Sequence, residues 1–192
     1  MKNSLVILST LIASAVSAQT TWKADATHSS VKFSVSHLVV SETEGTFKVY
    51  DANVTSTKED FTDAKIDFAI DVNSINTENE MRDKHLKSDD FFNAEKFPKI
   101  LFKGASFKKV SGNKYLLEGE LTIRDVTKKV KLDVVYGGTV KDPYGNTKAG
   151  FKVTGTVDRL AYGLKWNTLT EAGGAVVGKD VELTVKLELQ KQ

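Results

Sequence analysis

A chain of 192 residues, 40% of them hydrophobic and 27% charged, has the size and composition of one globular domain. The formal net charge is only +2 and the lysines are spread among acidic residues, which excludes the clustered basic face of a nucleic-acid-binding protein. The lack of cysteine excludes disulfides and thiolate metal sites, so the core alone must hold the fold.

The first residues of the chain have the pattern of a secretory signal peptide. Lys2 precedes an apolar run from Leu5 to Val16, and small residues follow up to Ala18. The run is shorter than the roughly 20 apolar residues that a membrane-spanning helix needs, and no later stretch is apolar enough to span a membrane. We therefore predict a signal peptide over residues 1–18 and a mature domain over 19–192, exported to the periplasm, or to the outside if the source lacks an outer membrane.

Strict alternation of apolar and polar residues dominates the mature chain and predicts half-buried strands. The alternating segments lie at 31–35, 66–72, 115–123, 130–136, 151–157 and 181–189. Turn residues between strands, such as Gly112, Gly137-Gly138 and Pro143, predict short antiparallel connections. A sheet of about eight such strands leaves no unpaired edge strand if it closes on itself. We therefore expect an all-β fold, an eight-stranded antiparallel barrel that is just wide enough for side chains or one slender ligand.

One segment, at about residues 77–94, departs from the strand pattern and predicts a short helical insert. Thr77 and Glu80 have the spacing of a capping box, in which each side chain bonds the other residue's backbone N–H. Met81 and His85 then share one face of the helix. We expect this insert to cover one end of the barrel.

Two polar residues have the strand parity of core positions. His37 alternates with Val35, and it is either a core histidine with an internal partner or a contact to a ligand. Arg159 alternates with Val157, and its charge needs either an acid such as Asp25 or the head group of a ligand. The sequence leaves both choices open. No histidine has the spacing of a metal site, so no metal is expected.

The catalytic motifs of hydrolases, zinc peptidases, nucleotide-binding and dinucleotide-binding enzymes are absent from the sequence. We therefore expect no catalytic residue and a protein that is not an enzyme. The alternative is an enzyme or accessory factor of isoprenoid or quinone metabolism in which His37 or His85 acts as acid or base. That function would require a polar cleft with a histidine in hydrogen-bond reach of a carboxylate.

Four groups of residues, in order along the chain, carry a family resemblance. Residues 25–38 are similar to D-x-x-H-S-x-V-x-F-x-V-x-H-L, and residues 75–102 to I-x-T…R-D-x-H-L-x-S-x-D-F-F…P-x-x-x-F. Residues 119–128 are similar to G-x-L-T-I-x-G-V-T-K, with Asp125 at the glycine, and residues 159–163 to R-x-x-[FY]-G. The chain thus resembles the YceI-like family of polyisoprenoid-binding, lipocalin-like proteins, although Lys165 to Gly178 fits only loosely and its conformation is not predicted.

The resemblance implies an eight-stranded, lipocalin-like barrel with an elongated apolar pore that takes an isoprenoid chain. Candidates for lining this pore are inward-facing or insert residues, namely Phe33, Val35, His37, Phe47, Phe68, Ile70, Met81, His85, Phe91, Phe92, Phe102, Leu121, Ile123, Val153 and Trp166. Candidates for binding the head group are His37, His85 and Arg159.

The function expected from the sequence is therefore transport, storage or sequestration of a polyprenyl lipid or an isoprenoid quinone. This ligand is the only partner expected, without any cofactor, and the sequence leaves a homodimer open. Besides the enzyme, a secreted stress-related barrel filled with its own side chains is a second alternative. The head group and chain length of the ligand are not predicted.

Overall fold

The computed structural model describes residues 19–171 and 173–192, so the predicted signal peptide lies outside the described residues. The strands are β1 (Thr20–Ala24), β2 (Ser30–His37), β3 (Ser41–Phe47), β4 (Tyr50–Ser56), β5 (Lys65–Asp71), β6 (Ile75–Asn76), β7 (Lys99–Ser111), β8 (Lys114–Ile123), β9 (Val126–Lys141), β10 (Thr147–Asp158) and β11 (Val177–Lys191). The helices are η1 (Val72–Ser74), α1 (Glu80–Lys87) and η2 (Leu160–Tyr162). Within the described part of the chain, no helix has the length and apolar character to cross a membrane.

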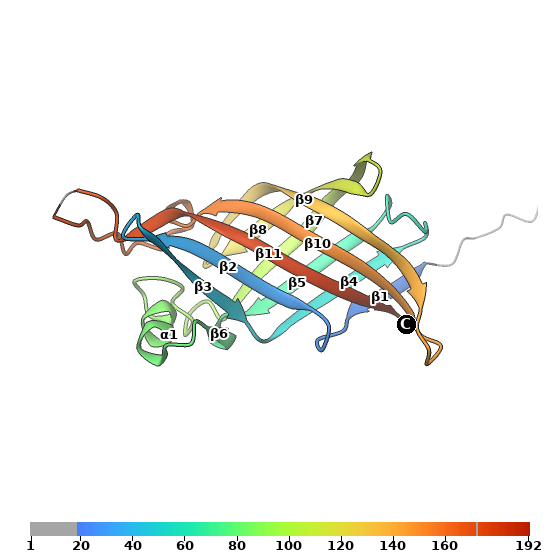
Figure 1. Cartoon of the computed structure of the whole chain (residues 1–192), viewed down its shortest axis with the longest axis horizontal. Helices are drawn as coiled ribbons and strands as arrows, with labels where there is room; N and C mark the ends of the chain where they lie inside the picture. Colours follow the sequence, from blue (N-terminus) through green and yellow to red (C-terminus); the bar gives the residue numbers. More distant parts are fainter. Residues whose placement is uncertain (1–18, 172) are drawn as a thin grey trace, which may run out of the picture.

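The strands form one closed antiparallel barrel with α1 at one end (Figure 1). Both β1 and β2 pair with β11, one after the other along its length, so together they fill one strand position of the barrel. In the same way β4 and β3 pair with β1 and β2, and β5 and β6 pair with β4 and β3. The pairing therefore makes an eight-stranded antiparallel barrel, as predicted from the alternation.

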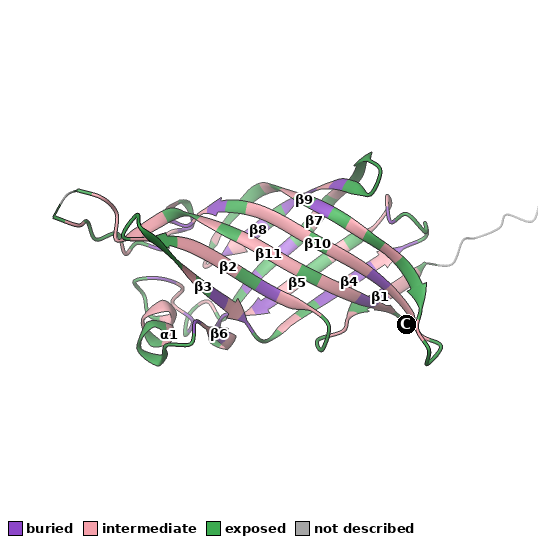
Figure 2. Ribbon diagram, in the orientation of Figure 1, coloured by how far each residue is buried: buried purple, intermediate pink, exposed green. Residues whose placement is uncertain are grey.

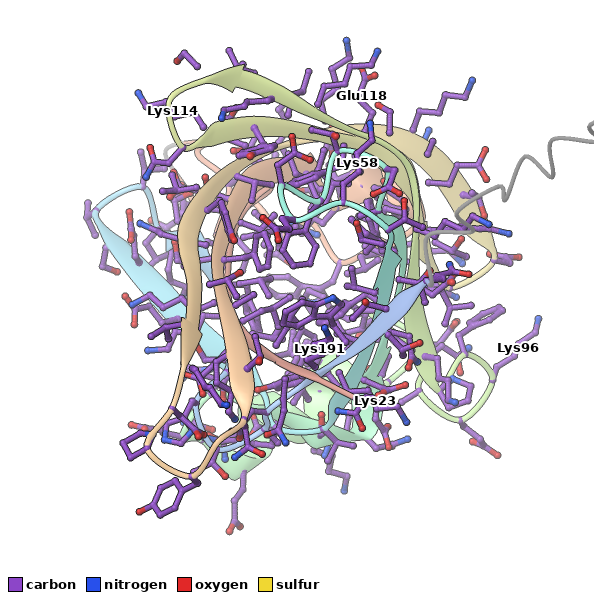
Figure 3. All side chains as sticks on the ribbon, turned by 90° about the vertical axis from the view of Figure 1, so that its right-hand side faces the viewer. Lys23, Lys58, Lys96, Lys114, Glu118 and Lys191 are labelled. Carbon is purple, nitrogen blue, oxygen red and sulfur yellow. The ribbon has the colours of Figure 1, made fainter. Side chains whose placement is uncertain are left out.

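Alternating side chains separate the inside of the barrel from its outer surface. Along β8, Tyr115, Leu117 and Leu121 are buried while Glu120 between them is exposed, and Figure 2 shows the same alternation on neighbouring strands. Figure 3 looks into the end opposite α1 and shows charged side chains such as Glu118 on the outer surface. The period of two in the sequence thus sets which side chains face inward.

Aromatic rings fill the end of the barrel opposite α1. The loop between β4 and β5 bends over part of this end, at the label Lys58 in Figure 3. It carries Phe61, which is only 2% exposed although its backbone φ is +60°. The ring centroid of Phe61 lies 5.1 Å from Trp22, 5.8 Å from Tyr136 and 5.1 Å from Phe151. These four rings, the aromatic plug, close one end of the barrel by hydrophobic packing.

A charged cluster ties the junction of β1 and β2 to the last two strands. The Lys148 ammonium is 2.7 Å from Asp25 and 3.4 Å from Glu188, and His28 lies 3.1 Å from the same Asp25 carboxylate. The hydrogen bond from Lys148 is the main reason why the pKa of Asp25 lies well below its usual range. Asp25 is thus the partner of Lys148, and it is not the acid that Arg159 could have paired with.

The helical insert is present, but its predicted capping box is wrong. The helix begins after Asn79, whose side chain accepts a hydrogen bond from the Arg82 backbone N–H at 3.0 Å. Thr77 cannot be the cap, because Glu78 after it has a φ of +60° and turns the chain. The Thr77 hydroxyl instead donates to the Asp83 carboxylate at 2.6 Å, and this bond ties the segment before the helix to α1.

The pair Gly137-Gly138, predicted as a turn, lies inside the long strand β9. Gly138 has a φ of +103°, and the register against β10 shifts between Gly150 and Phe151. The glycines therefore form a β-bulge, which bends the strand without ending it. The β9–β10 turn follows at residues 142–146.

Candidate functional site

The half of the barrel next to α1 is hollow. An inner cavity of about 130 Å³ lies between the strands, and a mouth cavity of about 190 Å³ lies between the β2–β3 hairpin and α1. Five residues line both of them, namely Phe33, Val35, Leu86, Phe91 and Val177. The two cavities are therefore neighbours, and together they reach the lower end of the roughly 300–1,000 Å³ typical of ligand pockets.

The inner cavity has an apolar wall. Apart from Lys32 and Arg159, every residue lining it is aliphatic or aromatic. Eight predicted pore residues line it, namely Phe33, Val35, Phe47, Ile70, Phe91, Phe92, Leu121 and Ile123. Sequence reasoning missed the alternate residues of β11, which form another part of the wall, namely Val181, Leu183 and Val185. Their alternation was visible in the sequence, but all strands show it, so parity alone does not separate a hollow from a filled interior.

Glycines on neighbouring strands make room for two of the inward aromatic rings. A Cβ atom on Gly45 would lie 2.3 Å from the ring of Phe33, and one on Gly119 would lie 2.4 Å from the ring of Phe102. Phe33 borders both cavities, whereas Phe102 is packed over Gly119 and does not line the inner cavity. Phe102, predicted to line the pore, therefore lies in the packed core beside Gly119 and does not border these two cavities.

Polar side chains gather at the mouth. The mouth cavity is lined by both predicted histidines and by Thr43, Arg82 and Trp166. The ring of His85 packs at 5.0 Å from Phe91 and 5.7 Å from Trp166, and its Nε2 lies 2.8 Å from an oxygen of Asp90.

Arg82 at this mouth was not among the predicted site residues. Its Nε and Nη2 donate to the hydroxyl and the carbonyl of Thr77, at 2.8 and 2.7 Å. Those bonds hold the guanidinium beside the cavity although the side chain is exposed. The R-D-x-H-L motif brought Arg82 and His85 together in sequence, but only the fold shows that both reach the mouth.

Arg159 lies deep in the structure, with 3% of its surface exposed, and it lines the inner cavity. Its guanidinium donates to four backbone carbonyls, those of Leu164, Trp166, Val177 and Gly178, at 2.7–3.0 Å. Among the residues that the structure describes, no carboxylate lies within ion-pair distance of it. Burial lowers the pKa of Arg159. The four bonds hold both ends of the segment, at residues 164–166 and 177–178, against the barrel.

Three other predicted pore residues do not line these two cavities. Val153 lines a third cavity of about 50 Å³ near the aromatic plug, which shares no lining residue with the inner cavity. Phe68 stacks on Tyr50 at 6.0 Å within the packed core. Met81 is 83% exposed, so the prediction for it is wrong: it lies on the solvent side of α1, while Leu86 faces the cavities.

Known proteins resemble the chain in both sequence and fold. The model of the family described as "YceI-like domain" matches residues 22–189. A UPF0312 protein of Staphylococcus aureus (strain N315) is 41% identical over 165 residues, which cover 85% of this chain and 94% of the relative. The crystal structure of the Campylobacter jejuni YCEI protein is 33% identical, with a TM-score of 0.71 over 82% of this chain and 90% of that one.

A more distant structure shares the fold alone. It is a polyisoprenoid binding domain from Saccharophagus degradans, 16% identical, with a TM-score of 0.67 over 89% of this chain and 98% of that one. The family match and the two closer relatives confirm the resemblance that the four sequence motifs predicted. The chain therefore belongs to the YceI-like family.

Proposed function

We propose that this protein is exported and binds one long apolar molecule, a polyprenyl lipid or an isoprenoid quinone, for transport, storage or sequestration. The observation that carries the proposal is the apolar wall of the inner cavity, which opens toward a mouth with polar side chains. Membership of the YceI-like family and the shared fold of a polyisoprenoid binding domain support it.

The shape of the interior favours one orientation of the ligand. Burial of apolar ligand surface contributes about 25 cal/mol per Å², so the isoprenoid tail gains most in the inner cavity. The aromatic plug closes the far end, so the tail enters from the α1 side and cannot pass through the barrel. The head group then stays at the mouth, where His37, Arg82 and His85 offer polar groups for hydrogen bonds.

The alternative of an enzyme has one observation in its favour, the pair of His85 and Asp90 with 2.8 Å between Nε2 and the carboxylate. The surroundings favour binding instead, because the same imidazole is packed between Phe91 and Trp166 beside apolar cavities. Binding without bond making or breaking is therefore the function we propose.

The alternative of a filled barrel applies to only half of the molecule. The aromatic plug fills the end opposite α1, while the inner cavity and the mouth cavity leave the other half hollow. A barrel that needed only its own packing would fill this half as well, because empty apolar volume costs stability.

A titration with ubiquinones tests the proposal, because a quinone ring quenches nearby tryptophan fluorescence. The two tryptophans separate the ends of the barrel, with Trp166 at the mouth and Trp22 in the aromatic plug. In a Trp22→Phe variant, a long-tailed ubiquinone should quench Trp166 saturably, with about one ligand per chain. A Trp166→Phe variant should show much weaker quenching. A tail-free benzoquinone is the matched probe, and equal quenching by both quinones would contradict binding through the tail.

A further inference from the structure

Two loops lie side by side beyond the mouth of the barrel. The turn at 38–40 joins β2 to β3. The loop between η2 and β11, described at 165–171 and 173–176, projects from this end of the molecule (Figure 1). The Leu38 backbone N–H donates to the Val176 carbonyl at 2.8 Å. A Cβ atom on Gly174 would lie 3.3 Å from a methyl group of Val39, so the two loops are in contact.

Both loops expose large apolar side chains. The exposed fractions are 42% for Leu38, 72% for Val39, 85% for Val40 and 59% for Leu169. We call these four residues the apolar tip. Single exposed apolar residues are common, but several of them on two touching loops are typical of an interaction site.

The backbone of the turn makes these residues more unusual. Leu38 and Val39 have φ values of +53° and +65°, and the Val40 N–H bonds the His37 carbonyl at 3.2 Å, as in a type I′ turn. Asn-Gly is the preferred pair for such a turn, whereas a β-branched residue at positive φ is strained. Leucine and valine therefore weaken this turn, and solvent gives them no compensating contact.

The apolar tip is continuous with the opening of the pore. His37 and Val176, which flank the tip in sequence, both line the mouth cavity, and Val177 lines both cavities. A long isoprenoid has little solubility in water and resides in lipid bilayers, so it must cross between a bilayer and this mouth. Contact of the tip with a bilayer would bring the mouth to the place where the ligand is found.

We propose that the apolar tip inserts into the surface of a phospholipid bilayer, where the protein loads or unloads its ligand. The loading role rests on the proposed function. At the roughly 100 Å² of a fully exposed aliphatic side chain, the four partly exposed side chains of the tip offer less than about 400 Å². This is under half of the ~800 Å² that each partner buries in a standard protein interface. Exposed charged residues of both signs lie in or next to the two loops in sequence, namely Glu42, Lys165, Glu171 and Lys179. A small projecting apolar group with a mixed-charge rim fits a fluid, zwitterionic bilayer.

The test is flotation of the mature protein with vesicles of pure phosphatidylcholine. The double variant Leu38→Asn/Val39→Gly removes two side chains of the tip and supplies the preferred residues of a type I′ turn. It should bind the vesicles at least about tenfold more weakly than the wild type, while its thermal midpoint stays the same or rises. The matched control is Val140→Asn/Tyr144→Asn, which removes exposed apolar side chains of 65% and 90% exposure at the opposite end. This control should bind vesicles like the wild type.

The outcomes separate this inference from the proposed function. If the wild type binds ubiquinone but does not float with vesicles, or if the tip variant floats equally well, the bilayer contact is refuted and ligand binding stands. If the protein floats through its tip but takes up no ubiquinone, the proposed function fails instead. Concentration-dependent dimerisation that the tip variant abolishes, without vesicle binding, would identify a second copy of the chain as the occupant and overturn the inference.

Discussion

Substitution Val185→Phe should stabilise the fold and weaken ligand binding at the same time. Val185 lines the deep end of the inner cavity and pairs across the sheet with Val31 and Val153. At about 24 cal/mol per Å³, an empty cavity of about 130 Å³ costs roughly 3 kcal/mol. A phenyl ring fills part of it, so we expect a gain of about 1 kcal/mol and a rise of about 2–4 °C in the thermal midpoint.

The same ring takes space from the ligand. The substitution adds about four carbons, and displacing as many ligand carbons at ~0.8 kcal/mol each weakens binding by about 3 kcal/mol, or roughly 100-fold. Thermal unfolding and the ubiquinone titration measure the two effects. Thr184→Val, on the outward face of the same strand, is the control and should change neither by much. Unchanged affinity in a stabilised Val185→Phe protein would refute the inner cavity as the binding site.

Three further predictions concern the scaffold of the site. Lys148 holds the pKa of Asp25 below its usual range, so the charge of Asp25 stabilises the fold above about pH 4 and stabilises it less as the pH falls. Asp25→Asn should therefore lower the thermal midpoint of unfolding at pH 7, and its difference from the wild type should shrink below about pH 4. Arg159→Met leaves four carbonyls without their donor and should lower the free energy of unfolding by about 3 kcal/mol or more, with faster hydrogen exchange over 164–178. Unchanged stability would mean that Arg159 serves only a ligand. Gly119→Ala places a Cβ atom 2.4 Å from the ring of Phe102 and 2.5 Å from the Lys103 carbonyl oxygen, and it should cost about 1–3 kcal/mol in a denaturant titration. No loss would show that both the ring and the neighbouring strand move away at little cost.

Most of the fold could be predicted because inward and outward residues alternate along nearly every strand. The eight-stranded barrel and the helical insert both followed from this pattern and from the segment that breaks it. The predictions of a helix cap at Thr77 and of a turn at Gly137-Gly138 were wrong for a local reason. A cap and a bulge depend on the φ of single residues, such as Glu78 and Gly138, which side-chain patterns do not specify.

The site was harder to predict because parity selects inward residues without telling which of them border empty space. Phe33 and Phe102 have the same parity and a similar glycine beside them, yet only Phe33 lines the cavities. The aromatic plug was missed because Phe61 lies in a polar loop, where alternation gives no signal. Its only sequence signal is a lone aromatic residue among charged and hydroxyl side chains.

The most direct test of ligand binding is native mass spectrometry of the mature protein, purified without detergent from its own source, with extraction of any bound molecule. We predict about one isoprenoid lipid or quinone per chain, lost in the Val185→Phe variant and retained in Thr184→Val. A ligand-free wild-type protein that also takes up no added isoprenoid would contradict the account.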